Sequence, residues 1–349
     1  MTTSALELAR ELGHERVVVA RDAAAGLLAV IAIHDSTLGT AVGGTRMRRY
    51  PAFDDAVVDA LRLSHAMTRK CAFAGMPYGG AKAVIFADPQ RDKTPNLLEA
   101  YGRVVEELGG RFLTGCDMGI EIADLAWISR ATRHVGHTPA SAAVDASDLT
   151  AIGVVAALRA LAGRSGQRLA EWTIALQGVG EVGRRLAQRL ASEGSRLVIA
   201  DTVAERAAAI AAATGARVVA PDAIYDEPCD AFSPNAAGGT LDRATLARLR
   251  APAICGAANN PLAGDELAAE LARRSVIYAP DFVVNAGGVL SLLLETGTLD
   301  EAAVVARVER IGDDLAELLD LAAARGTTPL AEADRKVADR LAAARAARR

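Results

Sequence analysis

Lysine is rare in this chain, and two of the positions that keep it suggest chemistry. Only four of the 39 basic residues are lysine. Lys82 lies in the stretch GMPYGGAKAVI, where a glycine-rich turn opens into an apolar run, and Lys70 lies twelve residues earlier. An ammonium group can lose its proton when it is desolvated or crowded by another cation, whereas a guanidinium stays charged. One interpretation is that Lys70 binds an anion and Lys82 acts as a base. The alternative is a pair of surface lysines.

The stretch RFLTGCDMG supplies a third candidate group. Asp117 follows a predicted strand and begins a turn. A carboxylate that faces a lysine can exchange protons with an amine as that amine becomes ammonia. The alternative is that Asp117 is only the N-cap of the helix predicted over IEIADLAWI. The other two lysines, Lys93 and Lys336, are predicted to be solvated.

A second set of residues has the spacing of a dinucleotide-binding turn. Gly178, Gly180 and Gly183 directly follow the predicted strand WTIALQ and open a predicted helix. Such glycines permit a tight turn, the approach of a pyrophosphate and close helix packing, with the phosphates on the helix N-terminus. Asp201 ends the next strand, where an acid accepts ribose hydroxyls and repels a 2′-phosphate. NAD is therefore favoured over NADP, although Arg206 could help to bind a 2′-phosphate. The alternative is a glycine turn in another doubly wound protein, with Asp201 as a helix cap.

Alternating strands and helices must position these groups. Strands over VVVA, LLAVIAIH and AVIFA, a helix from Asp54 to Lys70 and a helix capped by Thr94 and Pro95 form one α/β unit. From Ser147 onward, the strands WTIALQG, RLVIAD, RVV, DAFSP, APAICGA and SVIYAP alternate with helices, which requires parallel pairing.

A chain of 349 residues has room for two domains. The small-residue segment 135–146 is the predicted linker between them. We expect an α/β protein with an N-terminal substrate-binding and oligomerisation domain and a Rossmann-type doubly wound domain. The first would be 1–140 with 328–349 returning to it, and the second 141–327.

Composition excludes several classes of partner. The net charge of −4 gives no electrostatic reason to expect nucleic acid or an anionic membrane. The four cysteines are scattered without a paired framework, as in a reduced cytosolic protein. The N-terminus lacks the order of a signal peptide, and we expect no apolar run of about 18 residues that could span a bilayer. His134 and His137 lack a third ligand, so no metal site is expected. Cytoplasmic localisation is the default.

Six stretches, in order, resemble the Glu/Leu/Phe/Val dehydrogenase superfamily, and specifically its shorter leucine/valine/phenylalanine branch. They are LGTAVGGTRM, ALRLSHAMTRKCAFAGMPYGGAKAVI, RFLTGCDMG, LQGVGEVG, GAANNPL and YAPDFVVNAGGV. The resemblance implies reversible oxidative deamination of an L-amino acid to the 2-oxo acid and ammonia. It also implies that hydride passes to NAD in a cleft between two domains, and that the protein is a homo-oligomer.

The resemblance also implies roles for single residues. Lys70 resembles the lysine that holds the substrate carboxylate, and Lys82 resembles the base that activates water for attack on the imine. Asp117 resembles the acid that moves protons at the amino nitrogen. Backbone at Gly43 and Gly44 resembles the segment that positions the substrate. The residues expected to bind the cofactor are Gly178, Gly180, Val182, Gly183, Asp201, Thr150, Asn259 and Asn260.

Four positions match the family's side-chain pocket, namely Val42, Gly115, Val289 and Leu292. All are apolar or lack a side chain, so glutamate would bury an unpaired carboxylate at a cost of roughly several kcal/mol. Gly115 favours aromatic substrates and Val289 favours branched aliphatic ones. We expect leucine or valine first and phenylalanine second.

Two positions depart from the family pattern. Asn235, in SPNAAGG, stands where a cysteine is usual, and Asp148 stands where a small or apolar residue is more familiar. They leave open a protein of another class, a catalytically silent NAD-binding regulator. The joint presence of Lys70, Lys82 and Asp117 argues against that alternative.

Overall fold

The computed structural model describes residues 4–136 and 145–348, which form two compact units. Unit 1 comprises Met1–Ala143 and Val337–Arg349, and unit 2 comprises Val144–Lys336. The domain boundary expected at 140/141, and most of the predicted linker, lie outside the described residues. Helix α14 (Pro329–Ala347) begins in unit 2 and ends in unit 1.

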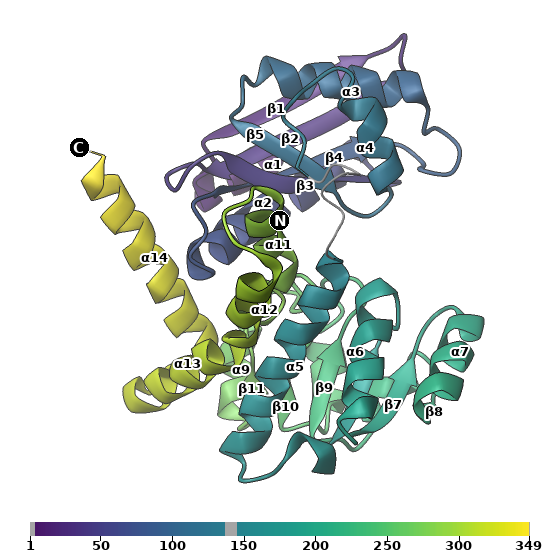
Figure 1. Cartoon of the computed structure of the whole chain (residues 1–349), viewed down its shortest axis with the longest axis vertical. Helices are drawn as coiled ribbons and strands as arrows, with labels where there is room; N and C mark the ends of the chain where they lie inside the picture. Colours follow the sequence, from purple (N-terminus) through teal and green to yellow (C-terminus); the bar gives the residue numbers. More distant parts are fainter. Residues whose placement is uncertain (1–3, 137–144, 349) are drawn as a thin grey trace. The chain divides into compact units, whose positions relative to one another are not determined.

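Unit 1 contains a five-stranded sheet with helices on both faces (Figure 1). Its elements are α1 (Ala5–Leu12), β1 (Arg16–Asp22), β2 (Leu27–Asp35), β3 (Ala41–Arg48), α2 (Phe53–Phe73), β4 (Gly79–Phe86), α3 (Pro95–Glu107), β5 (Phe112–Cys116) and α4 (Ile122–Ile128). The strand order is β1-β2-β4-β3-β5. β2 is antiparallel to β1 and β4, whereas β3 is parallel to β4 and β5.

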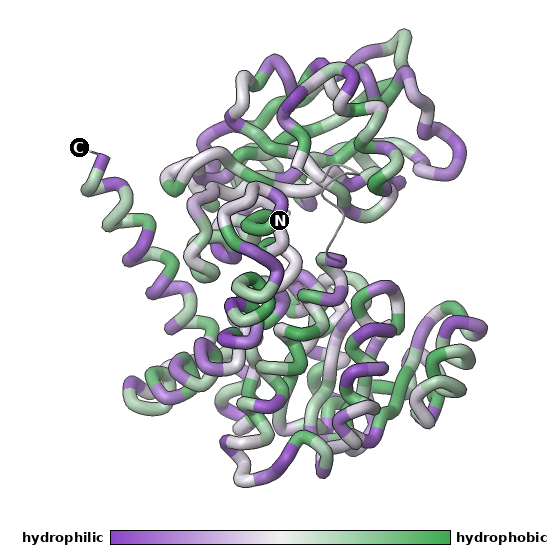
Figure 2. The backbone as a smooth tube through the Cα atoms, viewed as in Figure 1, coloured by the Kyte–Doolittle hydropathy of each residue, from purple (hydrophilic) through white to green (hydrophobic). Residues whose placement is uncertain are grey.

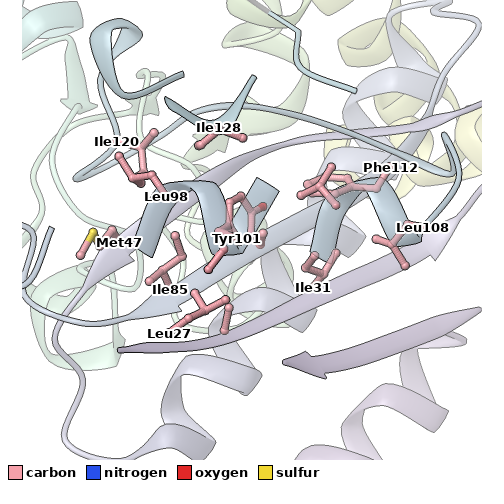
Figure 3. Packing of buried hydrophobic residues seen from close by; sticks show 14 of the residues in the cluster. Leu27, Ile31, Met47, Ile85, Leu98, Tyr101, Leu108, Phe112, Ile120 and Ile128 are labelled. Carbon is pink, nitrogen blue, oxygen red and sulfur yellow. The ribbon is translucent and has the colours of Figure 1, made fainter. Parts of the chain in front are cut away.

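Alternate residues along these strands pack against different helices, as the two-residue period of a strand requires. Ile31 and Ile85 join Tyr101 of α3 in one buried cluster, which Figure 3 shows with side chains from α3 lying over the sheet. Val30 and Val84 instead pack with residues of α1 and α2. We call this second side of the sheet the α2 face.

The elements predicted in unit 1 agree with the structure to within a few residues, whereas α1 and β3 were not predicted. Thr94 caps α3 as predicted, because its hydroxyl accepts a hydrogen bond from the Leu97 backbone N–H at 3.2 Å and Pro95 occupies the first turn. Helix α2 continues three residues past Lys70, where we expected its end. β3 was not predicted, because Gly43 and Gly44 weaken the strand pattern.

Unit 2 is built on a six-stranded parallel sheet, as predicted, with the order β11-β10-β9-β6-β7-β8. Its elements are α5 (Ala146–Arg164), β6 (Thr173–Gln177), α6 (Glu181–Ser192), β7 (Arg196–Ala200), α7 (Ala204–Thr214), β8 (Arg217–Val218), β9 (Ala231–Pro234), α8 (Arg243–Arg248), β10 (Ala253–Ile254), α9 (Leu267–Arg273), β11 (Ile277–Tyr278), α10 (Asp281–Val284), α11 (Gly287–Glu295), α12 (Glu301–Glu309) and α13 (Ile311–Arg325), with 3₁₀ turns at Leu169–Glu171 and Ala223–Asp226. The chain runs outward from β6 in one direction and from β9 in the other, so the switch point lies between them.

Helix α5 corrects one expectation. It is long and apolar enough to cross a membrane by length and composition alone, although we expected no such segment. More than half of its apolar window is buried inside the protein, where α5 packs against α6, α11, α12 and α13. Its apolar composition is explained by its place in the core of unit 2. Figure 2 shows α14, by contrast, alternating between hydrophilic and hydrophobic residues along its length.

Candidate active site

Strand register gathers the predicted catalytic residues on the α2 face of unit 1. Lys82 lies two residues before Val84, and Arg46 is in register with Val84 on the neighbouring strand, so all three share that face. Gly115 of β5 is in register with Gly44 of β3. Val42 has the same parity as Gly44 and lies on this face, whereas Gly43 has the opposite parity and packs its backbone against β4.

Two glycines allow the elements around this face to approach closely. A Cβ atom on Gly80 would lie 2.1 Å from the backbone nitrogen of Thr68, so only glycine lets α2 pack so near β4. A Cβ atom on Gly44 would lie 2.9 Å from the Cβ of Asp117. The first glycine brings α2, which carries Lys70, onto β4, and the second leaves space for the Asp117 side chain.

Asp117 is the centre of an ion-pair network. Its Oδ2 atom contacts Lys82 Nζ and accepts a hydrogen bond from Arg46 Nε at 3.2 Å. Burial by itself would raise the pKa of Asp117, but the charges of Lys82 and Arg46 outweigh it and hold the pKa well below its usual range. The helix-cap alternative for Asp117 is wrong, because α4 begins at Ile122 after the N-cap Glu121.

Both candidate lysines are buried. Lys70 is 8% exposed and Lys82 is 7% exposed, so the surface-lysine alternative is wrong. Lys93 was also misjudged, because its Nζ donates to Asp124 Oδ2 at 2.7 Å and to the Gly119 carbonyl at 3.1 Å. It therefore ties down the turn that follows Asp117. Lys336 pairs with Glu317 and is more exposed, as predicted.

Arg46 is a site residue that the sequence analysis missed. Besides Asp117, it contacts Asp59 of α2, where its NH1 donates to Oδ2 at 2.9 Å. The Tyr50 hydroxyl donates to the same Asp59 oxygen at 2.5 Å. The signal available in the sequence was a charged residue two positions after Gly44, which strand alternation would have placed on the same face.

The glycine turn of unit 2 has the shape that a dinucleotide requires. Gly178 follows β6 with φ +92°, and a Cβ on Gly183 would lie 2.2 Å from the Gly178 carbonyl oxygen. Gly180 is the N-cap of α6, and Val182 is half-buried in its first turn. The N-terminus of this twelve-residue helix therefore stands at the carboxyl end of the sheet, where it can receive phosphate groups.

Asp201 closes this turn from the neighbouring strand. Its carboxylate accepts hydrogen bonds from the backbone N–H groups of Val179 and Val203, each at 2.9 Å. Arg206 NH1 lies 3.4 Å from Asp201 Oδ1. The helix-cap alternative is wrong, since α7 begins at Ala204 with Val203 as its N-cap. An aspartate has about four acceptor positions. Two of them accept the backbone N–H groups, and the Arg206 guanidinium lies at 3.4 and 3.5 Å from the two oxygens.

The loop after β10 carries Asn259 and Asn260 and is bonded to α10 and to Asn285, the residue that follows this helix. The Asn260 backbone N–H donates to Asp281 Oδ2 at 2.8 Å, and its φ of 48° is unusual for a residue other than glycine. Asn285 Nδ2 donates to Asn259 Oδ1 at 3.0 Å. Asn285 Oδ1 is buried without a partner among the residues described, which is the state expected of a group that bonds a ligand. Asn285 lies inside the stretch YAPDFVVNAGGV but was not predicted as a site residue.

The remaining predicted positions of unit 2 lie on α5 and α11. Thr150, in the first turns of α5, is 8% exposed, and a Cβ on Gly288 would lie 2.8 Å from its hydroxyl oxygen. Val289 and Leu292 are both buried and lie three residues apart on α11, which places them on one side of the helix.

Both departures from the family pattern have structural partners. Asn235 Oδ1 accepts from the Ala257 backbone N–H at 2.9 Å, and its Nδ2 donates to the Ser233 carbonyl at 2.9 Å. Asn235 thereby links the ends of β9 and β10 beside the glycine turn. Asp148 forms a two-pronged pair with Arg189 of α6, with N–O distances of 3.0 and 2.6 Å.

These features define a class of protein. A doubly wound parallel sheet with a glycine turn and an acid at the end of its second strand is the binding unit of Rossmann-type dehydrogenases. A second α/β unit carries a buried lysine in contact with a carboxylate. Within the described ranges, no cluster of three or more His, Cys, Asp or Glu side chains is placed to hold a metal ion.

Comparison with known proteins identifies the family. The dimerisation-domain model of the Glu/Leu/Phe/Val dehydrogenases matches residues 14–134, and the Glutamate/Leucine/Phenylalanine/Valine dehydrogenase model matches residues 199–348. Valine dehydrogenase of Streptomyces albus is 40% identical, covering 96% of this chain and 94% of the relative. Phenylalanine dehydrogenase of Bacillus thermotolerans is 39% identical, covering 95% and 89%. The crystal structure of L-tryptophan dehydrogenase from Nostoc punctiforme superimposes with a TM-score of 0.79 at 38% identity, covering 97% of this chain and 99% of that one.

The chain belongs to the Glu/Leu/Phe/Val dehydrogenase family. It is an amino acid dehydrogenase, an oxidoreductase that acts on CH–NH2 donors.

Proposed function

We propose that this protein catalyses the reversible, NAD-dependent oxidative deamination of an apolar L-amino acid. Leucine or valine is the preferred substrate and phenylalanine the second, and the products are the 2-oxo acid and ammonia. The observation that carries the proposal is the contact between Lys82 and Asp117 on the α2 face of unit 1. Imine hydrolysis needs an amine that can take a proton from water beside a carboxylate that can serve the departing nitrogen.

Each side chain has one task in this proposal. Lys70 binds the substrate carboxylate as an ammonium, and Gly43 and Gly44 present backbone to the substrate. Lys82, as the neutral amine, takes a proton from the water that attacks the imine carbon. Asp117 accepts and returns protons at the amino nitrogen, and its lowered pKa keeps it ionised until a proton is delivered. Burial of both lysines keeps bulk water from competing for these protons.

The described residues of unit 2 suit a nicotinamide dinucleotide. The glycine turn admits a pyrophosphate onto the N-terminus of α6, and Asp201 accepts from the ribose hydroxyls. Val182 lies in the first turn of that helix. In this proposal Thr150, Asn259 and Asn260 hold the nicotinamide end. Asn285 Oδ1, which has no partner among the described residues, offers another acceptor. When bound, NAD accepts the hydride from the substrate Cα.

NAD is proposed over NADP because of Asp201. A 2′-phosphate would carry roughly two negative charges toward a carboxylate whose side chain is only 5% exposed. In the described part of the chain, Arg206 is the only cation that Asp201 contacts. Because the Arg206 guanidinium is paired with Asp201, its positive charge is less available to attract a phosphate.

The preference for apolar substrates rests on four positions. Val42, Val289 and Leu292 are buried and apolar, and Gly115 has no side chain. A charged substrate side chain would lose its hydration there without a partner. A difference of one methylene changes selectivity only about 10–200-fold, so both aliphatic and aromatic amino acids should react.

Assembly and compartment complete the proposal. The family description of residues 14–134 as a dimerisation domain supports a homo-oligomer. In the described part of the chain none of the four cysteines forms a disulfide and two are buried, which suits a reducing cytoplasm.

An amino-acid panel tests the function directly. Purified protein, NAD and each of the twenty L-amino acids at alkaline pH should produce reduced cofactor fastest with leucine, valine or phenylalanine. Lys82→Arg keeps the positive charge but removes the amine that can lose a proton, so turnover should fall about 10²- to 10⁴-fold. NAD affinity should be retained. Absence of turnover with every amino acid would favour a silent NAD-binding regulator, and a near-normal rate in the variant would contradict the base assignment.

A further inference from the structure

Arg46 and Lys82 share a single carboxylate oxygen. Arg46 Nε donates to Asp117 Oδ2 at 3.2 Å, and Lys82 Nζ contacts the same atom. The Arg46 side chain is 12% exposed and that of Asp117 is 20% exposed, so the water that would screen these charges is largely excluded. The two cations therefore influence each other strongly.

This arrangement bears on a difficulty in the proposed reaction. A lysine paired alone with a carboxylate is stabilised as an ammonium, which opposes its use as a base. A second cation on the same carboxylate neutralises the negative charge and repels the ammonium.

Arg46 is well suited to this task because a guanidinium stays charged and presents several donors in a fixed plane. Its NH1 group is held at 2.9 Å by Asp59 of α2, which also accepts the Tyr50 hydroxyl at 2.5 Å. The groups that act on the Arg46 charge are Asp117, Asp59 and Tyr50, and Lys82 contacts Asp117. Asp59 and Asp117 therefore bond different nitrogen atoms of the guanidinium.

We propose that Arg46 is a positioning residue of the deamination, which fixes the Asp117 carboxylate and shifts Lys82 toward its neutral form. The inference rests on the proposed function of Lys82 as the base. It extends that function by adding a residue from β3 whose charge sets the pH range of activity.

A simpler account is that Arg46 only ties β3 to α2 through Asp59. The two accounts differ in what three variants should do. Arg46→Gln removes the charge but keeps similar length, Arg46→Lys keeps the charge but loses the forked geometry, and Asp59→Asn breaks the tie while leaving the Arg46 charge in place. A structural tie predicts that Arg46→Gln and Asp59→Asn behave alike.

The first measurement is the pH dependence of kcat/KM for leucine. The acid limb should move to higher pH by on the order of one unit in Arg46→Gln, because loss of the neighbouring cation favours the ammonium form of Lys82. It should stay or move slightly to lower pH in Asp59→Asn, since an anion has been removed. Arg46→Lys should keep the limb near its wild-type position with a lower kcat.

The second measurement does not depend on turnover. Trace labelling of free amines across a pH series, followed by mass spectrometry, reports the unprotonated fraction of each lysine. Only four lysines are present, so every labelled site can be resolved, and Lys336 on α14, with its side chain 36% exposed, serves as an internal reference. The midpoint for Lys82 should shift upward in Arg46→Gln and not in Asp59→Asn, while Lys336 stays constant in all variants.

The outcomes separate this inference from the function on which it rests. An unmoved labelling midpoint for Lys82 in a folded Arg46→Gln variant overturns the inference, whether or not the enzyme turns over amino acids. Equal shifts in Arg46→Gln and Asp59→Asn also overturn it, in favour of the structural tie. If the Lys82 midpoint shifts in Arg46→Gln but the wild-type protein turns over no amino acid, the electrostatic coupling is supported and the proposed reaction is refuted.

Discussion

At the scale of single residues, cofactor choice depends on one carboxylate and one guanidinium. Asp201 accepts two backbone N–H groups and contacts Arg206, whose side chain is 47% exposed. Removal of the Asp201 negative charge has two consequences, and both favour binding of NADP. It ends the repulsion of a 2′-phosphate and it frees Arg206 to bind one.

Asp201→Asn should therefore raise kcat/KM for NADP relative to NAD by at least about 10-fold, the equivalent of one charge-assisted contact of about 1.4 kcal/mol. Steady-state kinetics with both cofactors measures the ratio. The matched control is Asp201→Asn with Arg206→Gln, which should lose most of the gain in NADP use. If the double variant uses NADP as well as the single one, Arg206 has no part in the selectivity.

Site residues could be predicted from the sequence where their type or their position was unusual. Lys82 and Asp117 were found because an amine in an arginine-rich chain and an acid in a turn are conspicuous, and the structure places them in contact. Arg46 was missed because one arginine among many carries no signal by its type. Asn285 was missed because burial of an unpaired oxygen is a property of the folded loop and has no counterpart in the sequence.

At the scale of elements, Lys93 holds the turn that follows β5. Lys93 Nζ bonds the Gly119 carbonyl and Asp124 Oδ2, and the same oxygen of Asp124 accepts the Glu121 backbone N–H at 2.8 Å. The Lys93 side chain is 20% exposed, so this amine links the turn that carries Asp117 to the start of α4. It was predicted to be solvated because QRDKTP looks like an ordinary surface loop.

Lys93→Met should leave a carbonyl and a carboxylate without their partner. The expected loss is about 1–3 kcal/mol in the unfolding free energy of unit 1, with a lower kcat because Asp117 is less firmly placed. Hydrogen exchange of the peptide containing Asp117 measures the local effect. Lys336→Met is the control, because the exposed pair between Lys336 and Glu317 is expected to contribute only about 0–1 kcal/mol. Equal effects of the two substitutions would show that Lys93 does not restrain the turn.

The strands and helices were largely predictable, and β3 shows why one was not. Hydrophobic period and caps identified most elements, since burial on one face imposes the pattern directly. In β3 the glycines serve a different requirement, because Gly44 must leave space for Asp117 and a Cβ on Gly43 would lie 1.8 Å from the Ala81 carbonyl oxygen. Because close approach of the backbone requires glycine, β3 lacks the alternating apolar side chains by which a strand is recognised in a sequence.

At the scale of the whole molecule, histidine is confined to one unit. All five histidines lie between residues 14 and 137, and unit 2 has none. Three of them pack edge to face in unit 1, with ring centroids 4.9 Å apart for His14 and His34 and 4.7 Å apart for His34 and His65. This histidine cluster lies where α1, β2 and α2 meet, because His34 bonds the Leu12 carbonyl and the Thr68 hydroxyl, each at 2.8 Å.

Burial favours the neutral form of all three rings. It lowers the pKa of His14 to about 4 and that of His65 to about 3, and it lowers the pKa of His34 as well. Nearby Asp35 and Glu15 oppose the shift at His34, whereas Arg345 adds to it, and Arg69 acts in the same direction on His65. Since His14 Nδ1 is buried without a partner among the described residues, protonation there would also require a new acceptor.

The sign of the pH dependence follows from these directions. An unfolded histidine binds a proton below about pH 6.5, while the folded rings stay neutral to much lower pH, so the unfolded state takes up protons first as pH falls. The unfolding free energy that the neutral histidine cluster contributes is complete above about pH 6.5. It is lost progressively toward pH 4 for His14 and pH 3 for His65. Asp117, with its lowered pKa, adds a loss of stability only below about pH 4.

Acidification from pH 7 to 5 should therefore destabilise unit 1 selectively, with an uptake of up to about three protons on unfolding. Hydrogen exchange followed by mass spectrometry, corrected for the intrinsic pH dependence of amide exchange, should show falling protection in α1, α2 and β2. Peptides of unit 2 provide the reference in the same sample, because that unit has no histidine to titrate in this range. His14→Gln should reduce the slope for unit 1 by about one proton, since glutamine cannot titrate there. If both units lose protection in parallel, the acid sensitivity does not come from the histidine cluster.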